Sequence, residues 1–309
     1  MNYTLNQLRI FLKIVDQKSI TRAADLLFLT QPAVSIQLKN FQDQFDIPLT
    51  EVINKKLYVT DFGYEIAEAA KLILDEVDSM QYKKAMYQGK LTGKIKMAVV
   101  STGKYIAPFL INDFLKQNPE VELILDVSNR DSVIRNLEKN EVDFVLMSLL
   151  PENIAIEHVE LMPNRLFLVG SKNSMEEFTK NKKQFFEKTP FIFREFGSAT
   201  RKVMDKYLSE QGIAAEKNIT LTSNEAVKQA VISGMGCSIM PLIGIKNELQ
   251  LGQLEILKAP KLPIQSKWYL VNLRDKKHLP AAKVFKEYLQ QNMEEIKSKY
   301  FNWDQNFLK

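Results

Sequence analysis

Hydrophobic periodicity changes twice along this 309-residue chain. Up to residue 45, apolar residues recur every three to four positions in three short stretches, which is the period of an amphipathic helix. Residues 61–88 keep one helical pattern without a break, and from residue 94 short β-rich apolar runs alternate with helical patterns. That alternation is typical of βαβ units and a mostly parallel sheet. The pattern therefore predicts a small helical domain, a long helix and an α/β domain.

The N-terminal stretch predicts three short helices within residues 3–45. Ser19 and Thr30 precede the second and third helices as N-caps, whose hydroxyls can accept hydrogen bonds from the free N–H groups of the first turn. Pro32 follows in the first turn of the third helix, where its missing N–H costs nothing. Thr-Gln-Pro at 30–32 therefore marks the beginning of a helix.

The third helix has two distinct faces. A projection at about 100° per residue places Val34, Leu38 and Phe41 on a buried side. The opposite side carries small, amide and basic residues and includes Pro32, Ile36, Lys39 and Asn40, with Gln31 and Ser35 at its edges. Such a face can lie against a DNA duplex and reach base edges in the major groove. The alternative is an ordinary solvated face of a three-helix cluster.

A predicted hairpin follows, "PLTEVINKKLYVTDFG", with two β-like runs around the polar turn Asn54-Lys55-Lys56. A hairpin of this kind next to a helix-turn-helix typically lays cations along the phosphates. The overall net charge of +5 permits a polyanionic partner without requiring one. The predicted DNA contacts are Arg22, Thr30, Gln31, Pro32, Ser35, Ile36, Lys39, Lys55 and Lys56.

The long helical pattern of residues 61–88 has a seam of apolar residues. They step by fours and threes, with Lys84 interrupting the series: Ile66, Ala70, Ile73, Val77, Met80 and Tyr87. A mean spacing of about 3.5 residues is that of a coiled coil, so a dimerisation helix is predicted. The alternative is a helix packed on its own domain. Gly89 and Gly93 follow, as expected of a linker.

The remaining chain predicts two α/β lobes with a cleft between them. One series of β-rich runs comprises "KIKMAVV", "VELILDV" and "DFVLMSL", and a second comprises "RLFLVG", "PFIF", "NITLT" and "GCSIM"; "KWYLVNL" then returns to the first sheet. The predicted domains are a winged helix-turn-helix at 1–60, a dimerisation helix and hinge at 61–92, a two-lobed domain at 93–300 and a tail at 301–309. Lobe I is placed at about 93–162 and 267–300, and lobe II at about 163–266.

Polar residues stand where the predicted strands end. Ligands of open α/β sheets bind outside the carboxyl ends of the strands, where helix N-termini point inward. The candidate ligand contacts are Ser101, Thr102, Ser128, Asn129, Ser148, Gly197, Ser198, Thr200, Arg201 and Asn224. Hydroxyls and free N–H groups, with Arg201 nearby, suit a small anion. The alternative is that each hydroxyl only caps a helix.

The stretch from "LNQLRIFL" to "QFDIPL", residues 5–49, resembles the winged helix-turn-helix of LysR-type transcriptional regulators, with "RAA" and "TQPAVS" at the expected separation. "REFGSATR" and "SNEAVKQAVISGMG" look like the branch that includes the Calvin-cycle regulator CbbR and the sulfite-reduction regulator CysL. The resemblance implies a periplasmic-binding-protein-like effector domain, double-stranded DNA and a small-molecule effector as partners, a homodimer that pairs into a tetramer, and RNA polymerase as a further candidate partner.

The chain departs from the family pattern at three places. Ile36 stands where the family usually has a basic residue, so this position can meet a thymine methyl but cannot make a bidentate guanine contact. Leu49-Thr50-Glu51-Val52 replaces "LFER", which removes an arginine and leaves more of the phosphate contacts to Lys55 and Lys56. Ala199 replaces the third residue of "GSGTR", where glycine is less restricted in φ.

Several other chemistries are not expected. His158 and His278 lie far apart and have no HExxH motif or cysteine partner, so no metal site, cofactor or catalytic residue is predicted. The single Cys237 cannot form an intramolecular disulfide, which suits a reducing compartment. Neither a signal peptide nor a run of about 18 apolar residues is present. The prediction is a cytoplasmic regulator without membrane contact; the alternative is a two-lobed binding protein or enzyme without a regulatory role.

Overall fold

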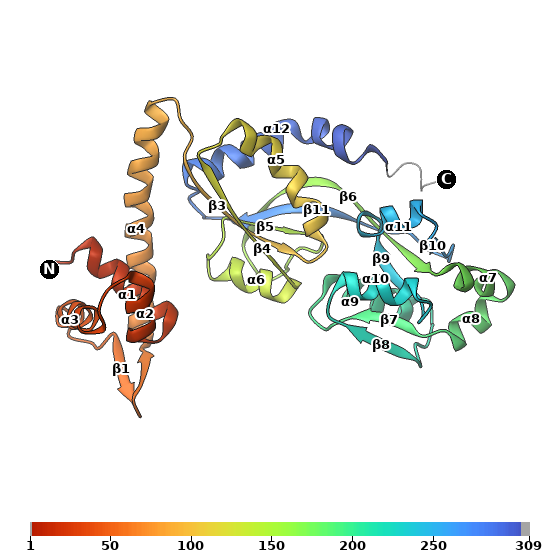
Figure 1. Ribbon diagram of the computed structural model, residues 1–309, viewed down its shortest axis with the longest axis horizontal. Helices are drawn as coiled ribbons and strands as arrows, with labels where there is room; N and C mark the ends of the chain where they lie inside the picture. The colour runs from red at the N-terminus through yellow and green to blue at the C-terminus, as the bar shows by residue number, and fades with distance from the viewer. Residues whose placement is uncertain (1, 304–309) are drawn as a thin grey trace. The chain divides into compact units, whose positions relative to one another are not determined.

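The computed structural model describes residues 2–303, apart from the side chains at positions 81, 85 and 86. The chain forms two compact units, residues 1–90 and 91–309 (Figure 1). Most of the predicted tail at 301–309 lies outside the described residues.

Three helices form the body of the N-terminal unit: α1 (Leu5–Gln17), α2 (Ile20–Leu27) and α3 (Gln31–Gln42). Ser19 caps α2 as predicted, because its hydroxyl accepts a hydrogen bond from the backbone N–H of Arg22. Thr30 also holds the N-cap position of α3, but its hydroxyl makes no capping hydrogen bond, contrary to the prediction. The predicted inner face of α3 is confirmed: Val34, Leu38 and Phe41 are buried in the core of this unit.

A hairpin follows, formed by β1 (Thr50–Ile53) and β2 (Lys56–Val59) in antiparallel pairing. Asn54 and Lys55 both have positive φ, 51° and 62°, which is the two-residue type I′ turn that matches the twist of a hairpin. Lys56 was predicted in the turn, but it is the first residue of β2 and pairs with Ile53. The cations Lys55 and Lys56 therefore stand next to each other at the tip.

The long helix α4 (Asp61–Tyr87) spans about 40 Å at 1.5 Å per residue. Its beginning packs on the helical core, where Ala67 and Ala70 are buried and Ile66 is half-buried. This part of the predicted seam thus packs against the N-terminal unit of the same chain. Further along the helix, Ile73 is 47% exposed and Met80 is 66% exposed. The apolar surface available to a partner is therefore shorter than the predicted seam.

The C-terminal unit alternates strands and helices. Its strands are β3 (Gly93–Val100), β4 (Val121–Ser128), β5 (Phe144–Met147), β6 (Ile156–Gly170), β7 (Phe191–Arg194), β8 (Asn218–Leu221), β9 (Ser238–Pro241), β10 (Glu255–Ile256) and β11 (Ile264–Leu273). Its helices are η1 (Gly103–Tyr105), α5 (Ala107–Gln117), α6 (Arg130–Glu138), α7 (Lys172–Lys180), α8 (Lys182–Lys188), α9 (Ala199–Glu210), α10 (Asn224–Ile232), η2 (Leu242–Gly244), α11 (Lys246–Gln250) and α12 (Pro280–Tyr300).

The main sheet has the order β10-β6-β11-β5-β3-β4, with β9 also paired to β6. Strand β3 is parallel to β4 and β5, and β7 is parallel to β8, as the alternating pattern predicted. The prediction of a mostly parallel sheet was wrong for the other strands of this sheet. Strand β11 pairs antiparallel with residues 156–166 of β6 and also with β5. The two long strands β6 and β11 run from lobe I, with β3, β4 and β5, into lobe II, with β7 to β10 (Figure 1).

Each lobe has its own apolar core. The core of lobe I forms around Phe114, Phe144, Trp268 and Phe285, where α5 and α12 pack together. Lobe II has separate clusters, one of them around Phe191. Because apolar packing is completed within each lobe, the surfaces that face each other between the lobes are free to carry polar groups.

Candidate functional site

The outward face of α3 carries most of the residues predicted to contact DNA. Helix α3 has no acidic residue, and Ile36 is 57% exposed, as its predicted outward position requires. Of the nine predicted contacts, Ser35 is half-buried and the others are exposed: Arg22, Thr30, Gln31, Pro32, Ile36, Lys39, Lys55 and Lys56. An exposed helix face with small, amide and basic side chains can approach a polyanion without repulsion between like charges.

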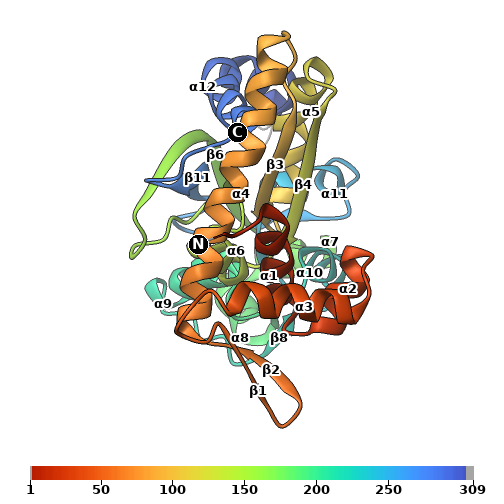
Figure 2. The same cartoon turned by 90° about the vertical axis from the view of Figure 1, so that its left-hand side faces the viewer.

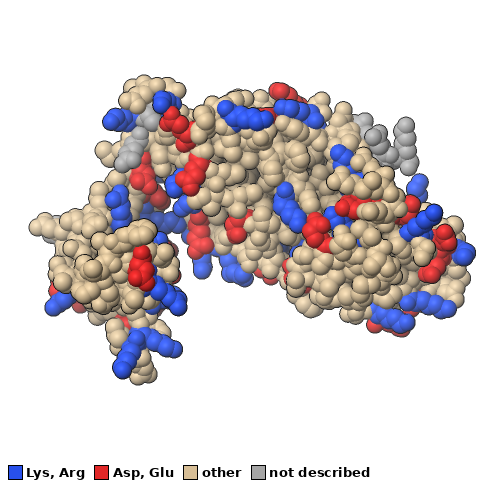
Figure 3. Space-filling model, in the orientation of Figure 1, with Lys and Arg blue, Asp and Glu red and all other residues tan. Residues whose placement is uncertain are grey.

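The hairpin adds cations to the same unit. Figure 2 shows α3 lying across the unit and the hairpin projecting beyond the lower end of α4. Figure 3 shows Lys and Arg side chains over the hairpin. Lys55 and Lys56 at its tip are exposed, so they can follow the phosphates of a duplex.

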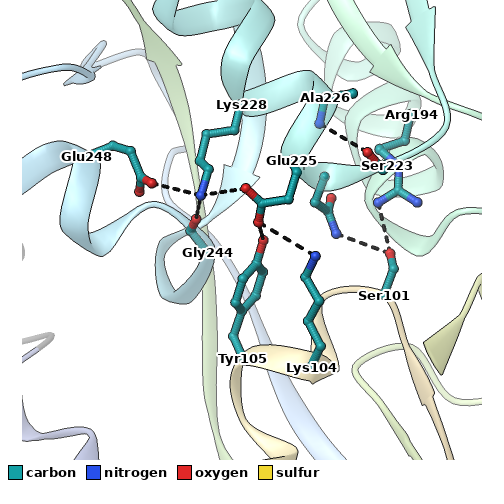
Figure 4. A network of polar contacts seen from close by, with 11 residues as sticks. Ser101, Lys104, Tyr105, Arg194, Ser223, Glu225, Ala226, Lys228, Gly244 and Glu248 are labelled. Carbon is teal, nitrogen blue, oxygen red and sulfur yellow. Dashed lines mark hydrogen bonds and ion pairs between the residues drawn. The ribbon is translucent and has the colours of Figure 1, made fainter. Parts of the chain in front are cut away.

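In the C-terminal unit, Ser101 joins the two lobes. It follows β3 of lobe I, and its Oγ accepts two hydrogen bonds from lobe II (Figure 4). One comes from Nη1 of Arg194 at 2.9 Å and the other from Nδ2 of Asn224 at 3.1 Å. The structure thus brings together Ser101 and Asn224, two candidate ligand contacts that lie far apart in the sequence.

Arg194, which the sequence analysis missed, is the central cation of this junction. Its side chain is 3% exposed, at the end of β7, and it forms a bidentate ion pair with Glu195: Nε and Nη2 each lie 2.8 Å from a carboxylate oxygen. The strand was predicted to end with "PFIF", one residue too early. An arginine directly after a buried strand, at the carboxyl edge of a sheet, was the signal that could have identified it.

The loop after β7 approaches lobe I closely at Gly197. This residue has a φ of +82°, and a Cβ added there would lie 2.6 Å from Oδ2 of Asp131 in α6. The positive φ favours glycine here, and any larger residue would also displace the side chain of Asp131. A cavity of about 370 Å³ lies at this approach, lined by Arg130, Asp131, Phe196, Gly197, Ser198, Arg201, Lys202 and Asp205. Three candidate ligand contacts, Gly197, Ser198 and Arg201, line this one cavity.

Arg201 borders that cavity, but its guanidinium is held within lobe II. Its Nε lies 2.8 Å from the carboxylate of Asp205, and Nη1 donates to the backbone carbonyl of Arg194 at 3.2 Å. The guanidinium also packs over the rings of Phe193 and Phe196, 4.1 and 4.7 Å from their centroids. Arg201 therefore supports Arg194 and the loop more than it presents free donors to a ligand.

Five other candidates occupy the predicted strand and helix ends without joining these contacts. Asn129 acts as a cap, because its Oδ1 accepts a hydrogen bond from the backbone N–H of Ser132 at 2.9 Å. Thr102 and Thr200 are buried, while Ser128 and Ser148 are half-buried. In the described part of the chain, none of these five hydrogen-bonds to Ser101, Arg194 or Asn224 through its side chain.

A second polar contact between the lobes was also missed by the sequence analysis. The hydroxyl of Tyr105 in lobe I donates a hydrogen bond to the carboxylate of Glu225 in α10, and Lys104 lies 3.6 Å from the same carboxylate (Figure 4). Burial raises the pKa of the Tyr105 hydroxyl, and the hydrogen bond to Glu225 raises it further. Tyr105 therefore remains a proton donor at any physiological pH.

Lys228 completes this contact from within lobe II. Its ammonium is nearly buried, 2.9 Å from Glu225 and 2.8 Å from Glu248. Burial lowers the pKa of this lysine, but its ion pairs with the two glutamates outweigh burial and raise the pKa above its usual value. Glu225 thus receives hydrogen bonds from both lobes.

Two other titratable groups of the described residues, Cys237 and His278, take no part in these polar contacts between the lobes. Among residues 2–303, no three His, Cys, Asp or Glu side chains lie close enough to hold a metal ion. Cys237 is fully buried, and burial raises the pKa of its thiol. His278 stacks on Phe144 with 4.6 Å between ring centroids. In the described residues, no helix is long and apolar enough to span a membrane.

Two family profiles match almost the whole chain. The helix-turn-helix profile described as "Bacterial regulatory helix-turn-helix protein, lysR family" matches residues 5–64, and the "LysR substrate binding domain" profile matches residues 88–294. The RuBisCO operon transcriptional regulator of Allochromatium vinosum is 36% identical over 94% of this chain and 96% of its own length. The regulator CbbR of Rhodospirillum rubrum is 35% identical over 92% of this chain and 95% of its own length.

Two solved structures show the same architecture. The regulatory domain of Synechocystis PCC6803 CcmR in complex with 2-PG is 27% identical, with a TM-score of 0.57 over 65% of this chain and 98% of that chain. Full-length CbnR, solved with its target DNA, is 19% identical, with a TM-score of 0.63 over 94% of this chain and 99% of that chain. The predicted fold class, with an N-terminal helix-turn-helix and a two-lobed α/β domain, is confirmed.

Proposed function

This chain belongs to the LysR family of bacterial transcriptional regulators, within the CbbR-like branch, and on that basis we propose how its two units bind DNA and a small anionic effector. It is a DNA-binding regulator with an effector-binding domain and not an enzyme. The observation that carries the effector proposal is the convergence of Arg194 and Asn224 from lobe II on Ser101 of lobe I. A cation and an amide donor directed into one cleft suit an oxyanion.

For DNA, α3 enters the major groove. Gln31, Ser35 and Ile36 face base edges, with Thr30 and Pro32 at the helix start close to the backbone. Arg22, Lys39, Lys55 and Lys56 contact phosphates. The exposure of these side chains and the absence of acidic residues in α3 support this assignment.

For assembly, the exposed side of α4 joins two chains. The dimer presents two α3 helices to successive major grooves, about 34–36 Å apart. Strand β4 is an edge of the main sheet, and Ile124 and Val127 on it are both 43% exposed. Because an unpaired strand edge of this kind favours association, we propose that it helps dimers pair into tetramers. The complex acts in the cytoplasm, where it can reach the chromosome and RNA polymerase.

For the effector, the proposed contacts are the ten candidates from the strand and helix ends, with Arg194 added. They are Ser101, Thr102, Ser128, Asn129, Ser148, Gly197, Ser198, Thr200, Arg201 and Asn224. The similar regulatory domain of CcmR was solved with 2-PG, 2-phosphoglycolate, which carries both a phosphate and a carboxylate. We propose 2-phosphoglycolate as the first ligand to test.

The experiment is a thermal-unfolding titration of the full chain with 2-phosphoglycolate. A ligand of the folded state raises the midpoint by mass action, so a rise that grows with concentration is expected. Thr102→Ala should lose the rise while it keeps affinity for operator DNA. A control with glycerol, which has hydroxyls but no charge, should give no specific rise. No rise in the wild type, with DNA binding intact, would reject this ligand and leave the DNA-binding function standing.

A further inference from the structure

Arg194 is more deeply buried than Glu195, the carboxylate that neutralises it. The side chain of Arg194 is 3% exposed, and its guanidinium is held by Glu195 and by Ser101. Arg201 holds the backbone of the same residue, because it donates to the carbonyl of Arg194. The side chain of Glu195 is 19% exposed, so it borders solvent. The cation is therefore fixed at the junction of the lobes, and the anion that neutralises it can move.

This arrangement limits what can bind at the junction. An anionic ligand that contacts Arg194 while Glu195 remains in place puts two negative groups against one buried cation. Like charges a few ångströms apart in a partly buried site repel each other strongly. Loss of Glu195 from the guanidinium costs less, because water can solvate the released carboxylate.

We propose that Glu195 is an internal competitor of the effector: its carboxylate occupies the guanidinium of Arg194 until an anionic ligand takes its place. This inference rests on the proposed effector site and adds a residue that sets the affinity of that site. The energetic cost of expelling Glu195 is subtracted from the binding energy of the ligand. Glu195 thereby sets the concentration of anion at which the protein responds.

The backbone of Glu195 is also hydrogen-bonded to neighbouring segments of lobe II. The backbone N–H of Glu195 donates to the carbonyl of Leu221 in β8, and its own carbonyl accepts from the N–H of Ser198. Gly197, which approaches Asp131 of lobe I, lies between them. The backbone of Glu195 is therefore part of the loop that meets the other lobe.

The test is a calorimetric titration of the full chain with inorganic phosphate at constant ionic strength. Glu195→Gln keeps the size of the side chain but removes its charge, so it should bind phosphate about tenfold more tightly than the wild type. Glu187→Gln is the matched control, since Glu187 is an exposed glutamate of α8 in the same lobe. It should leave phosphate affinity unchanged.

A second variant separates competition from a purely structural role. In the pair Arg194→Gln with Glu195→Gln, both charges are removed together, so no unpaired buried charge remains. The pair should be folded, by circular dichroism, and should lose the gain in phosphate affinity. Equal or weaker phosphate binding in Glu195→Gln, or an unchanged gain in the pair, would overturn the competitor role. Either result leaves the response of the wild type to 2-phosphoglycolate as a separate measure of the proposed function.

Discussion

At the scale of single residues, the turn between α2 and α3 carries an unusual side chain. Phe28 ends α2 in the left-handed conformation, with φ of 54°, and its side chain is 95% exposed. A side chain with a Cβ costs about 1 kcal/mol in that conformation, and asparagine tolerates it better. Nothing buried around Phe28 offsets this cost in the N-terminal unit taken alone.

Phe28→Asn is therefore expected to stabilise the free protein by about 0.5–1 kcal/mol, measured by urea unfolding followed by circular dichroism. Leu26→Asn is the control, because Leu26 is also exposed but has the ordinary backbone conformation of a helix. It should give no gain. A loss of stability in Phe28→Asn would mean that the aromatic ring makes a stabilising contact that outweighs the backbone strain.

Gln31 and Lys56 are expected to contribute to DNA binding in different ways, one to sequence preference and the other to affinity for any duplex. Gln31→Ala should cost about 1–3 kcal/mol on a preferred duplex and relax sequence preference, because an amide facing base edges is lost. Lys56→Ala should weaken binding to every duplex about equally and reduce the salt slope by about 1, because one phosphate contact is lost. Fluorescence anisotropy on matched and scrambled duplexes over a salt series measures both. The same response in both variants would contradict the division into base and phosphate contacts.

His278 should make stability depend on pH. Burial lowers its pKa from 6.5 to about 4 in the folded state, and neither ring nitrogen has a hydrogen-bond partner in the described structure. Below pH 6.5 the unfolded chain binds a proton at this position and the folded chain does not, so stability falls as pH falls from 6.5 to about 4. The loss is on the order of 2 kcal/mol. His278→Gln should lack this part of the pH dependence in urea unfolding at pH 7 and pH 4.5; parallel curves would show that the folded histidine titrates normally.

At the scale of elements, α4 divides into a part that packs on its own unit and a part with exposed apolar side chains. Ala67 and Ala70 belong to the core, whereas Ile73 and Met80 are exposed. Hydrophobic spacing alone could not separate the two, since both follow the same period. The division depends on where α1 lies against α4.

Met80→Glu is expected to convert the proposed dimer into monomers in light scattering at micromolar concentration, because it puts a charge into an apolar seam. Met80→Leu keeps the apolar character and the helix propensity, so it should remain associated. A dimer that survives Met80→Glu with unchanged affinity would exclude this face of α4 as the dimer contact.

The periodic parts of the sheet could be predicted from sequence, and the pairing could not. "VELILDV" and "KIKMAVV" carry the apolar β-rich pattern of β4 and β3, which are parallel as expected. The antiparallel partners β6 and β11 are separated by more than ninety residues, and no local pattern fixes which strands meet. Pairing direction follows from how the chain returns between lobes, which is a property of the whole unit.

The same reasoning explains what was missed between the lobes. Polar residues at strand ends identified Ser101 and Asn224 because strand ends recur at a predictable edge of a sheet. Arg194, Tyr105 and Glu225 each make a contact with the opposite lobe that the sequence does not reveal. An ion pair between sequence neighbours, such as Arg194 with Glu195, is indistinguishable in sequence from two solvated charges.

At the scale of the whole C-terminal unit, the contact of Tyr105 with Glu225 holds the lobes together. Tyr105→Phe removes a hydrogen bond to a charged acceptor and should destabilise this unit by about 1.5–3 kcal/mol in urea unfolding. Tyr58→Phe, an exposed tyrosine of the hairpin, should have no comparable effect. Equal stability of Tyr105→Phe and the wild type would mean that water replaces the hydroxyl without loss.

Glu225 should also make that contact sensitive to acid. Burial opposes ionisation of its carboxyl, but hydrogen bonds from Tyr105 and Lys228 prevail and hold its pKa below the usual 4.5. A carboxyl with a depressed pKa contributes stability above the unfolded value, and this stability is lost as pH falls through the folded value. The contact is therefore fully formed near neutral pH and weakens as pH falls through the lowered pKa of Glu225.

The two long strands β6 and β11 connect the two lobes of the C-terminal unit. Both pass from one lobe to the other, and their pairing shifts register between Trp268 and Tyr269. Paired strands resist stretching but can twist and bend, so rotation of one lobe about these strands is easier than separation of the lobes along them. In such a rotation, surfaces close to β6 and β11 move little, while surfaces far from these strands move further. A ligand that closes the cleft would therefore change the angle between the outer surfaces of the two lobes.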